Sequence, residues 1–215
     1  MIQHKVNGTV YGVILNDTVS VQKIGSLAEA PYKGAPQAPV LYLKPANTRA
    51  DCGAIIRLPD AADSVEVAAT IGLVMGRTAT RLTTEEALAS VCGVVLAADL
   101  SLPHSSYYRP AIREKCFDGA LPMSAIRPLP DLSALVLETE IDGKLVEQRS
   151  LATLIRSPAR LLAEVSEFMT LYQGDVLLVG ISYLAPQAAP GSRIRIRAEG
   201  LGCLDFSLAS SGVCP

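Results

Sequence analysis

Short apolar runs bounded by Gly, Pro and Asp recur along most of the chain, and this pattern predicts β-strands. We interpret residues 10–15, 40–43, 65–75, 91–98, 135–141, 144–149, 175–179 and 193–198 as strands. Asp142-Gly143 separates two of these runs and predicts a hairpin, because this pair accepts the positive φ angles of a two-residue turn. In the last run, Ile194 and Ile196 alternate with arginines, so one face is expected to be buried.

Two helices are predicted from their starting residues. Thr83 and Glu86 form a capping box, in which each side chain bonds the other residue's backbone N–H, and open a short helix through Ala89. Ser157 precedes a proline at the first helical position, where no amide hydrogen is needed, and predicts the longest helix, to Leu171. Its apolar residues share one face at helical spacing and are expected to pack in the core: Leu161, Leu162, Val165, Phe168 and Met169. Gly174 closes the segment.

These elements predict a β-rich α+β fold with a few short helices. No repeat and no linker divides the 215 residues, so a single domain over residues 1–215 is expected. Residues 17–39, rich in Ala, Pro and Gly, are predicted to form a loop or lid over it.

Composition excludes several classes of protein. Hydrophobic residues make up 49% of the chain, which excludes a disordered protein. The 19 basic and 21 acidic residues include no basic block, which argues against nucleic-acid binding. The longest uncharged run, residues 176–192, is shorter than the roughly 20 apolar residues of a membrane span and contains two prolines. No signal peptide is visible, so a cytoplasmic protein is expected.

The five cysteines form no CxxC pair, which argues against a zinc ribbon or a disulfide framework. A mean hydropathy of +0.31 is high for a monomer and indicates apolar surface buried against another subunit.

The chain has no GxGxxG, phosphate-binding or GxSxG motif. Its densest polar stretch, residues 99–118, directly follows a predicted strand, and polar groups at a strand's end often line a pocket. Arg109 and Lys115 in this stretch are candidates for binding carboxylates. A solvated loop tied down by ion pairs is an equally consistent interpretation.

Motifs along nearly the whole chain resemble those of the fumarylacetoacetate hydrolase family. They comprise Leu41-Tyr42-Leu43-Lys44-Pro45, Ile71-Gly72-Leu73-Val74-Met75-Gly76, Ala97-Ala98-Asp99-Leu100-Ser101, Tyr108-Arg109-Pro110, Lys115-Cys116-Phe117-Asp118-Gly119, Ser166-Glu167-Phe168-Met169-Thr170-Leu171 and Ala198-Glu199-Gly200-Leu201-Gly202. The stretch 101–112 resembles a narrower branch, the N-terminal halves or subunits of the isomerase/decarboxylases of 4-hydroxyphenylacetate (homoprotocatechuate) degradation. The resemblance implies a rolled, mixed β-structure, usually dimeric.

The resemblance also implies a divalent metal, Mg²⁺, Mn²⁺ or Ca²⁺, held by three carboxylates that leave positions open for a 2-oxo or enol acid. Two of the ligands are expected as Glu-x-Glu on one strand, at the positions that Ala68 and Thr70 occupy here. Asp99, 29 residues after Thr70, matches the third ligand. Glu66 lies on the same strand face but one step outside the pattern, so weak or absent metal binding is expected.

A His and a Glu expected on the lid are replaced by Ser20 and Lys23. The residues that match the family's anion-binding set are Lys44, Tyr108, Arg109, Lys115 and Asp118, with Lys115 the one catalytic candidate.

Four functions remain open. The chain is expected to be a subunit of the 5-oxopent-3-ene-1,2,5-tricarboxylate decarboxylase and 2-hydroxyhepta-2,4-diene-1,7-dioate isomerase, with a degraded metal site. A working enzyme with a metal on Asp99 and Glu66 is the second interpretation. A structural or dicarboxylate-binding partner of a metal-competent paralogue, as a homodimer or heterodimer, is the third. Another family hydrolase or decarboxylase of 2-oxo acids is the fourth.

Overall fold

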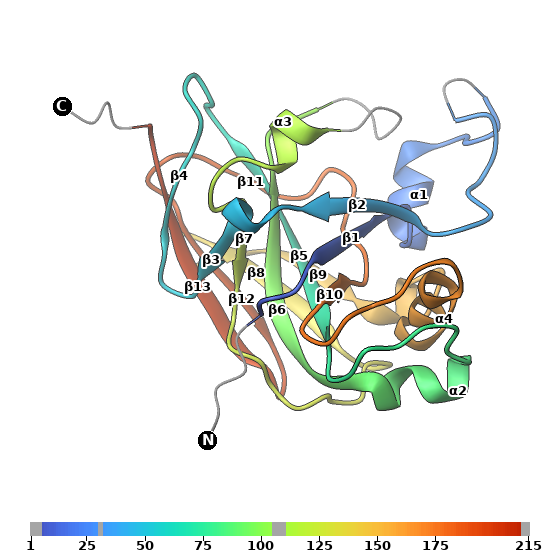
Figure 1. Ribbon diagram of the computed structural model, residues 1–215. Coiled ribbons are helices and arrows are strands. Elements are labelled where there is room, and N and C mark those ends of the chain that lie inside the picture. Colours follow the sequence, from blue (N-terminus) through green and yellow to red (C-terminus); the bar gives the residue numbers. More distant parts are fainter. Residues whose placement is uncertain (1–5, 30–31, 105–110, 212–215) are drawn as a thin grey trace.

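The computed structural model describes residues 6–29, 32–104 and 111–211. Its strands form two mixed sheets that pack against each other, with the helices at the margins (Figure 1). The strands are β1 Val10–Ile14, β2 Val40–Lys44, β3 Arg49–Asp51, β4 Ile55–Arg57, β5 Val65–Met75, β6 Val91–Ser101, β7 Leu121–Met123, β8 Val136–Ile141, β9 Lys144–Ser150, β10 Val176–Leu178, β11 Gln187–Ala188, β12 Arg193–Ala198 and β13 Gly202–Ala209. The helices are α1 Thr18–Ile24, α2 Thr84–Ala87, α3 Ile112–Lys115 and α4 Pro158–Phe168. The predicted β-rich α+β class is confirmed.

The larger sheet has the order β2-β1-β10-β5-β6-β7-β3, and β11 also pairs with β5. The smaller sheet has the order β4-β13-β12-β8-β9. Their facing surfaces bury one main core, in which Val67, Ala69 and Ile71 of β5 pack in the same cluster as Leu137 of β8 and Ile196 of β12. Both faces of β5 are buried, which explains why its sequence is a nearly continuous apolar run.

The predicted turn and caps are present. Asp142 and Gly143 have φ angles of 52° and 78° between β8 and β9. The Thr83 and Glu86 capping box is formed, and a 3₁₀ turn at residues 88–90 replaces the expected end of that helix. Ser157 caps α4, and the proline follows at the first turn.

Three predictions about elements are wrong in detail. α4 ends at Phe168 instead of Leu171, because the backbone of Leu171 exchanges hydrogen bonds with Ala79. Phe168, expected in the core, is 64% exposed. The segment 17–39, expected as a loop or lid, contains the helix α1, capped by Asp17, and is therefore not a loop throughout, while its role as a lid stays a prediction.

The strand before Asp99 was expected to end at Ala98, and this is also wrong. β6 continues to Ser101, since β5 supplies backbone partners through Glu66. Asp99 therefore lies inside a strand and is fully buried.

Candidate functional site

The even-numbered residues of β5 lie on the side of the sheet opposite the main core. Ala68 lies directly across the strand pair from Asp99, and Thr70 lies across from Ala97. Because side chains alternate along a strand, Ala68, Thr70 and Asp99 share one face. Ala68 packs there in a small apolar cluster that includes Ile181, with Tyr42 at its margin.

The Asp99 carboxylate is surrounded by three side chains. The ammonium groups of Lys44 and Lys115 lie 3.0 and 3.1 Å from its Oδ1 atom. The Tyr42 hydroxyl donates a hydrogen bond to its Oδ2 atom. Burial alone would raise the pKa of Asp99, but Lys115, Lys44 and the Tyr42 hydrogen bond outweigh it and hold the pKa below its ordinary value. Asp99 is therefore ionised, with both oxygens engaged.

Lys44 has no N–H left for a ligand. Its Nζ lies within hydrogen-bond distance of the carbonyl oxygens of Leu100 (3.3 Å), Lys115 (2.6 Å) and Ala120 (3.0 Å), in addition to Asp99. Four acceptors exceed its three hydrogens. Burial also lowers the pKa of Lys44, against the opposing effect of Asp99. Lys44 is thus a structural partner of Asp99.

Lys115 is placed differently. It comes from the last position of α3, its side chain is 7% exposed, and its Nζ lies 5.1 Å from the centre of the Tyr42 ring. One N–H points to Asp99, and two remain for other partners. Among the residues described, Lys115 is the site's candidate for binding an anionic ligand.

The comparison with protein families decides the relationship. The model for the "Fumarylacetoacetate (FAA) hydrolase C-terminal" family matches residues 9–209. The chain belongs to the fumarylacetoacetate hydrolase family.

Curated relatives and solved structures agree with this family. The 4-hydroxyphenylacetate degradation bifunctional isomerase/decarboxylase of Escherichia coli is 37% identical over 93% of this chain, which spans 47% of that protein. The chain therefore covers about half the length of this relative. The structure of 5-carboxymethyl-2-hydroxymuconate delta-isomerase from Mycobacterium smegmatis has a TM-score of 0.81 and 26% identity, covering 96% of this chain and 80% of that one.

A third structure shares the fold at lower identity. Fumarylpyruvate hydrolase from Pseudomonas aeruginosa, in complex with Mn²⁺ and pyruvate, has a TM-score of 0.80 and 20% identity, covering 95% of this chain and 90% of that one. These likenesses confirm the fumarylacetoacetate hydrolase-type rolled mixed β-structure. No helix within the described ranges is long and apolar enough to cross a membrane.

The donor atoms of this chain do not match the three-carboxylate metal set that the family resemblance implies. Ala68 has no donor atom, and the Thr70 hydroxyl donates to the carbonyl oxygen of Gly180 at 2.6 Å. Residues 6–29, 32–104 and 111–211 contain no group of three or more His, Cys, Asp or Glu side chains that could hold a metal. Glu66 is buried, which raises its pKa, while the charge of Lys115 opposes that rise.

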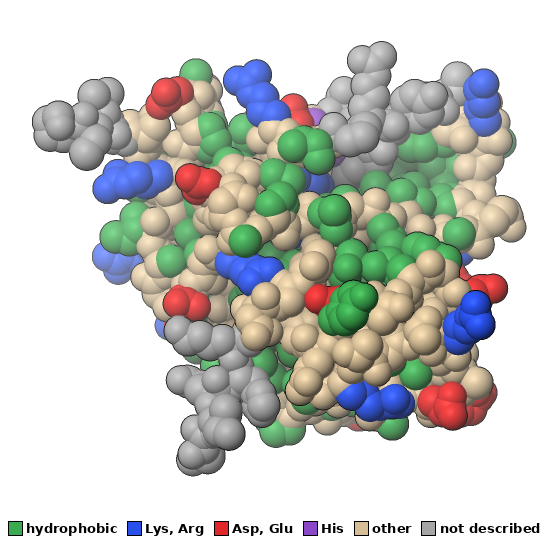
Figure 2. Space-filling model, viewed as in Figure 1, with side chains coloured by type: hydrophobic (Ala, Val, Ile, Leu, Met, Phe, Trp, Pro, Cys, Tyr) green, Lys and Arg blue, Asp and Glu red, His purple; other side chains and the backbone are tan. Residues whose placement is uncertain are grey.

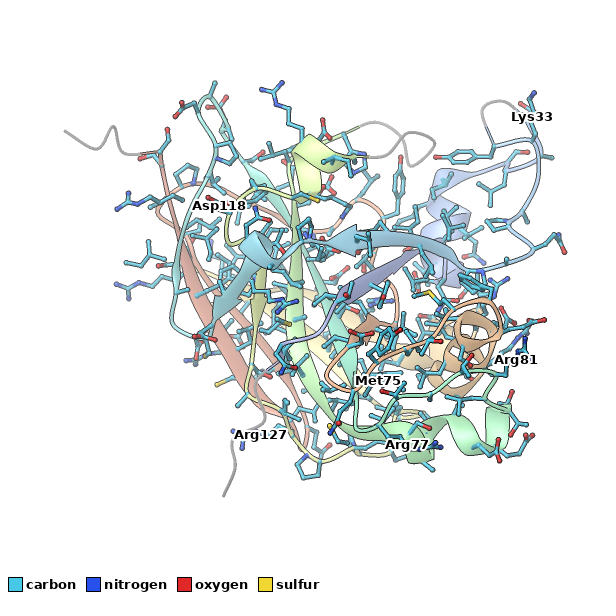
Figure 3. All side chains as sticks on the ribbon, in the orientation of Figure 1. Lys33, Met75, Arg77, Arg81, Asp118 and Arg127 are labelled. Carbon is cyan, nitrogen blue, oxygen red and sulfur yellow. The ribbon has the colours of Figure 1, made fainter. Side chains whose placement is uncertain are left out.

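Of the remaining predicted residues, the described ones form no bond with Asp99, and two lie outside the described residues. Asp118 is exposed on the loop after α3, where it accepts a hydrogen bond of 2.7 Å from Asn47 (Figure 3). Tyr108 and Arg109 lie outside the described residues. On α1, Ser20 donates to Asp17 and accepts from the backbone of Tyr183, while Lys23 is exposed.

Two residues of the site were missed from the sequence. Tyr42 was noted only as part of a motif, although it lies two positions before Lys44 and so on the same strand face. Arg149 is 5% exposed, and its Nη1 donates to the carbonyl oxygens of Ala69 and Gly180 at 3.1 and 3.0 Å. No local pattern signals this burial, because the sequence of β9, KLVEQRS, does not alternate between apolar and polar residues.

Proposed function

We propose that this chain is one subunit of a two-part 5-oxopent-3-ene-1,2,5-tricarboxylate decarboxylase and 2-hydroxyhepta-2,4-diene-1,7-dioate isomerase, and that its own pocket binds no divalent metal. The proposal that the pocket binds no metal rests on the set of partners around Asp99. Both oxygens of this carboxylate are engaged by Lys44, Lys115 and Tyr42. The two neighbouring positions that would complete a ligand set hold Ala68 and Thr70.

A divalent ion binds a protein through several oxygen ligands, and its affinity depends on their number and charge. Asp99 supplies one carboxylate, which two ammonium groups already neutralise. A cation entering this pocket would have to displace Lys115 and would remain close to Lys44. The chemistry of the two-part enzyme is accordingly assigned to a family member that retains both glutamates.

The role proposed for this chain's pocket is to hold one carboxylate end of a dicarboxylic 2-oxo or 2-hydroxy-dienoic acid. Lys115 provides the positive charge and free N–H groups, Asp99 fixes its position, and Tyr42 packs its ring beside it. Tyr108 and Arg109 stay proposed contributors to the same pocket.

The proposed association with a second subunit is supported by the surface of the chain. Figure 2 shows hydrophobic side chains gathered across the middle of one face. Exposed apolar residues include Leu43 on β2 (53%) and Tyr172 after α4 (62%). Burial of such side chains favours association, with a paralogue or with a second copy.

Ligand binding tests the pocket. We expect purified protein to bind 2-oxoglutarate, a stable dicarboxylic 2-oxo acid, in the presence of EDTA. Lys115→Met should weaken this binding at least tenfold in calorimetry. Lys144→Met, which removes an exposed lysine of β9, is the matched control and should leave it unchanged. Equal binding by wild type and Lys115→Met would contradict the pocket assignment.

Turnover tests the subunit role. Both reactions are followed by ultraviolet absorbance with this chain alone, with a family paralogue that retains Glu-x-Glu, and with the mixture, whose mass is measured by light scattering. We expect the mixture to form a complex and exceed the paralogue alone. Metal-dependent turnover by this chain alone, abolished by Glu66→Ala, would overturn the proposal.

A further inference from the structure

Arg149 fills a gap in the hydrogen bonding of β5 beside the pocket. β10 pairs with β5 as far as Gly72, and β11 pairs with it at Glu66 and Val65, which leaves the edge between them without a strand partner. The carbonyl oxygen of Ala69 in this gap accepts a hydrogen bond of 3.1 Å from Arg149 Nη1. Arg149 belongs to β9 of the other sheet, so its guanidinium reaches across to the segment that carries Ala68 and Thr70.

This buried cation has no contacting counterion. Within the described ranges no carboxylate forms an ion pair with Arg149, and its Nε and Nη2 atoms have no hydrogen-bond partner. The same face of the β8–β9 pair carries two further buried oxygens without partners, on Thr139 and Glu147. Asp17 and Glu147 interact electrostatically with Arg149 without forming a salt bridge to it. No described carboxylate therefore contacts the guanidinium.

The guanidinium lies next to the position of a missing metal ligand. Thr70 Oγ1 and Arg149 Nη1 donate to the same carbonyl oxygen of Gly180, at 2.6 and 3.0 Å. Because both bonds end on the same oxygen, Thr70 Oγ1 and Arg149 Nη1 are at most 5.6 Å apart. A longer, charged side chain at position 70 would come within ion-pair reach of Arg149, and a divalent ion held there would be repelled by it.

We propose that Arg149 is a fixed protein cation that excludes divalent metal from this pocket, so that restoring the two glutamates is not sufficient to create a metal site. The inference rests on the proposed function in treating the pocket as metal-free. The inference adds that Arg149 keeps the pocket free of metal. The absence of the two glutamates and the presence of Arg149 then each weaken metal binding independently.

The test uses four forms of the full chain, titrated with MnCl₂ and MgCl₂ by calorimetry. They are wild type, A68E/T70E, A68E/T70E/R149Q and A68E/T70E/R149K. Gln keeps a donor for the Gly180 carbonyl but removes the charge, whereas Lys keeps the charge. We expect no binding by wild type, and binding by the R149Q triple variant at least tenfold tighter than by A68E/T70E or the R149K triple variant.

Several results would overturn the proposal. These are equal affinity of A68E/T70E and the R149Q triple variant, binding by neither, or equal affinity of the R149Q and R149K triple variants. Metal binding by wild type would also contradict the proposed function. Tight binding by A68E/T70E, with no binding by wild type, would contradict only the role of Arg149. If a triple variant does not fold by circular dichroism, T70E against T70E/R149Q gives the same comparison, with at least a threefold difference in Mn²⁺ affinity expected.

Discussion

Asp99 and Arg149 are both buried charges beside the same stretch of β5, yet they are stabilised in different ways. Asp99 has two ammonium groups and a phenol as direct partners. Arg149 has two backbone carbonyls and no contacting carboxylate within the described ranges. The stability of a buried charge that is paired by side chains depends on those side chains. A buried charge that is held by backbone carbonyls depends on a stretch of strand whose carbonyls have no strand partner.

The comparison bears on the proposed absence of a metal from this site. Around Asp99, opposite charges lie within hydrogen-bond distance, and the cluster is satisfied without an added ion. Around Arg149, spare donors and the unpartnered oxygens of Glu147 and Thr139 leave the polar groups unsatisfied. We therefore expect the Asp99 cluster to dominate stability and Arg149 to control which ions enter.

The largest expected effect is that of Asp99→Asn, which leaves two buried ammonium groups without their counterion. Removing one partner of a buried ion pair typically costs about 3–5 kcal/mol, measured here by urea unfolding at pH 7. Asp175→Asn is the matched control, because Asp175 is also buried but accepts bonds from the backbone N–H groups of Thr9 and Tyr172. Its cost should be smaller, about 1–3 kcal/mol. Equal losses of unfolding free energy for Asp99→Asn and Asp175→Asn would show that pairing with the two ammonium groups stabilises Asp99 no more than backbone hydrogen bonds stabilise Asp175.

The difference in stability between wild type and Asp99→Asn is expected to depend on pH. The folded pKa of Asp99 is depressed, so its stabilisation is complete above the unfolded value of about 3.9 and is lost as the pH falls through the folded pKa. The difference in unfolding free energy between wild type and Asp99→Asn should therefore shrink as the pH is lowered below about 4. A difference that is constant from pH 7 to pH 3 would contradict this assignment.

Tyr42→Phe tests the third partner of Asp99. It removes one hydrogen bond to a buried carboxylate and keeps the ring beside Lys115, so an intermediate loss of about 1.5–3 kcal/mol is expected. Denaturant unfolding measures the loss, and Tyr172→Phe, at an exposed position, serves as the control. A neutral Tyr42→Phe would indicate that the hydroxyl is not needed to satisfy Asp99.

Arg149→Gln tests the second of the two buried charges. It weakens the bonds to the Ala69 and Gly180 carbonyls but removes a buried charge that has no contacting counterion, and these effects partly offset each other. We expect a loss of about 1–2 kcal/mol, well below that of Asp99→Asn. If the two losses were equal, the distinction between the clusters would be wrong.

The smallest effect is expected at Glu147, whose pKa burial raises despite the opposing influence of Ser182 and Arg149. For a carboxyl group with a raised folded pKa, ionisation costs stability once the pH exceeds the unfolded value. Glu147→Gln should therefore be neutral or stabilising by under about 1 kcal/mol at pH 7, with the gain disappearing near pH 4. A destabilised Glu147→Gln at pH 7 would point to a direct pairing with Arg149.

Much of the fold follows from local chemistry that the sequence displays. Thr83 and Ser157 cap helices, and Asp142-Gly143 makes a hairpin, because each depends on a few adjacent residues. The motifs also indicate the family, which the family comparison confirms, and strand alternation predicts that Ala68 and Thr70 share one face.

Tertiary structure alone decided what surrounds those positions. β13 and α1 were not anticipated, and β6 runs past Asp99 because β5, the preceding strand, supplies backbone partners as far as Ser101. The sequence could name Lys44 and Lys115 together, but only packing showed that four acceptors engage the first while the second keeps donors to spare.

Arg149 shows the same limit most clearly. Its place beside Thr70 depends on β9 of one sheet meeting a gap in β5 of the other, a contact between residues 80 positions apart. A sequence pattern records which faces are apolar, since alternation is local. It does not record which buried charges meet, because that is determined by how the sheets pack.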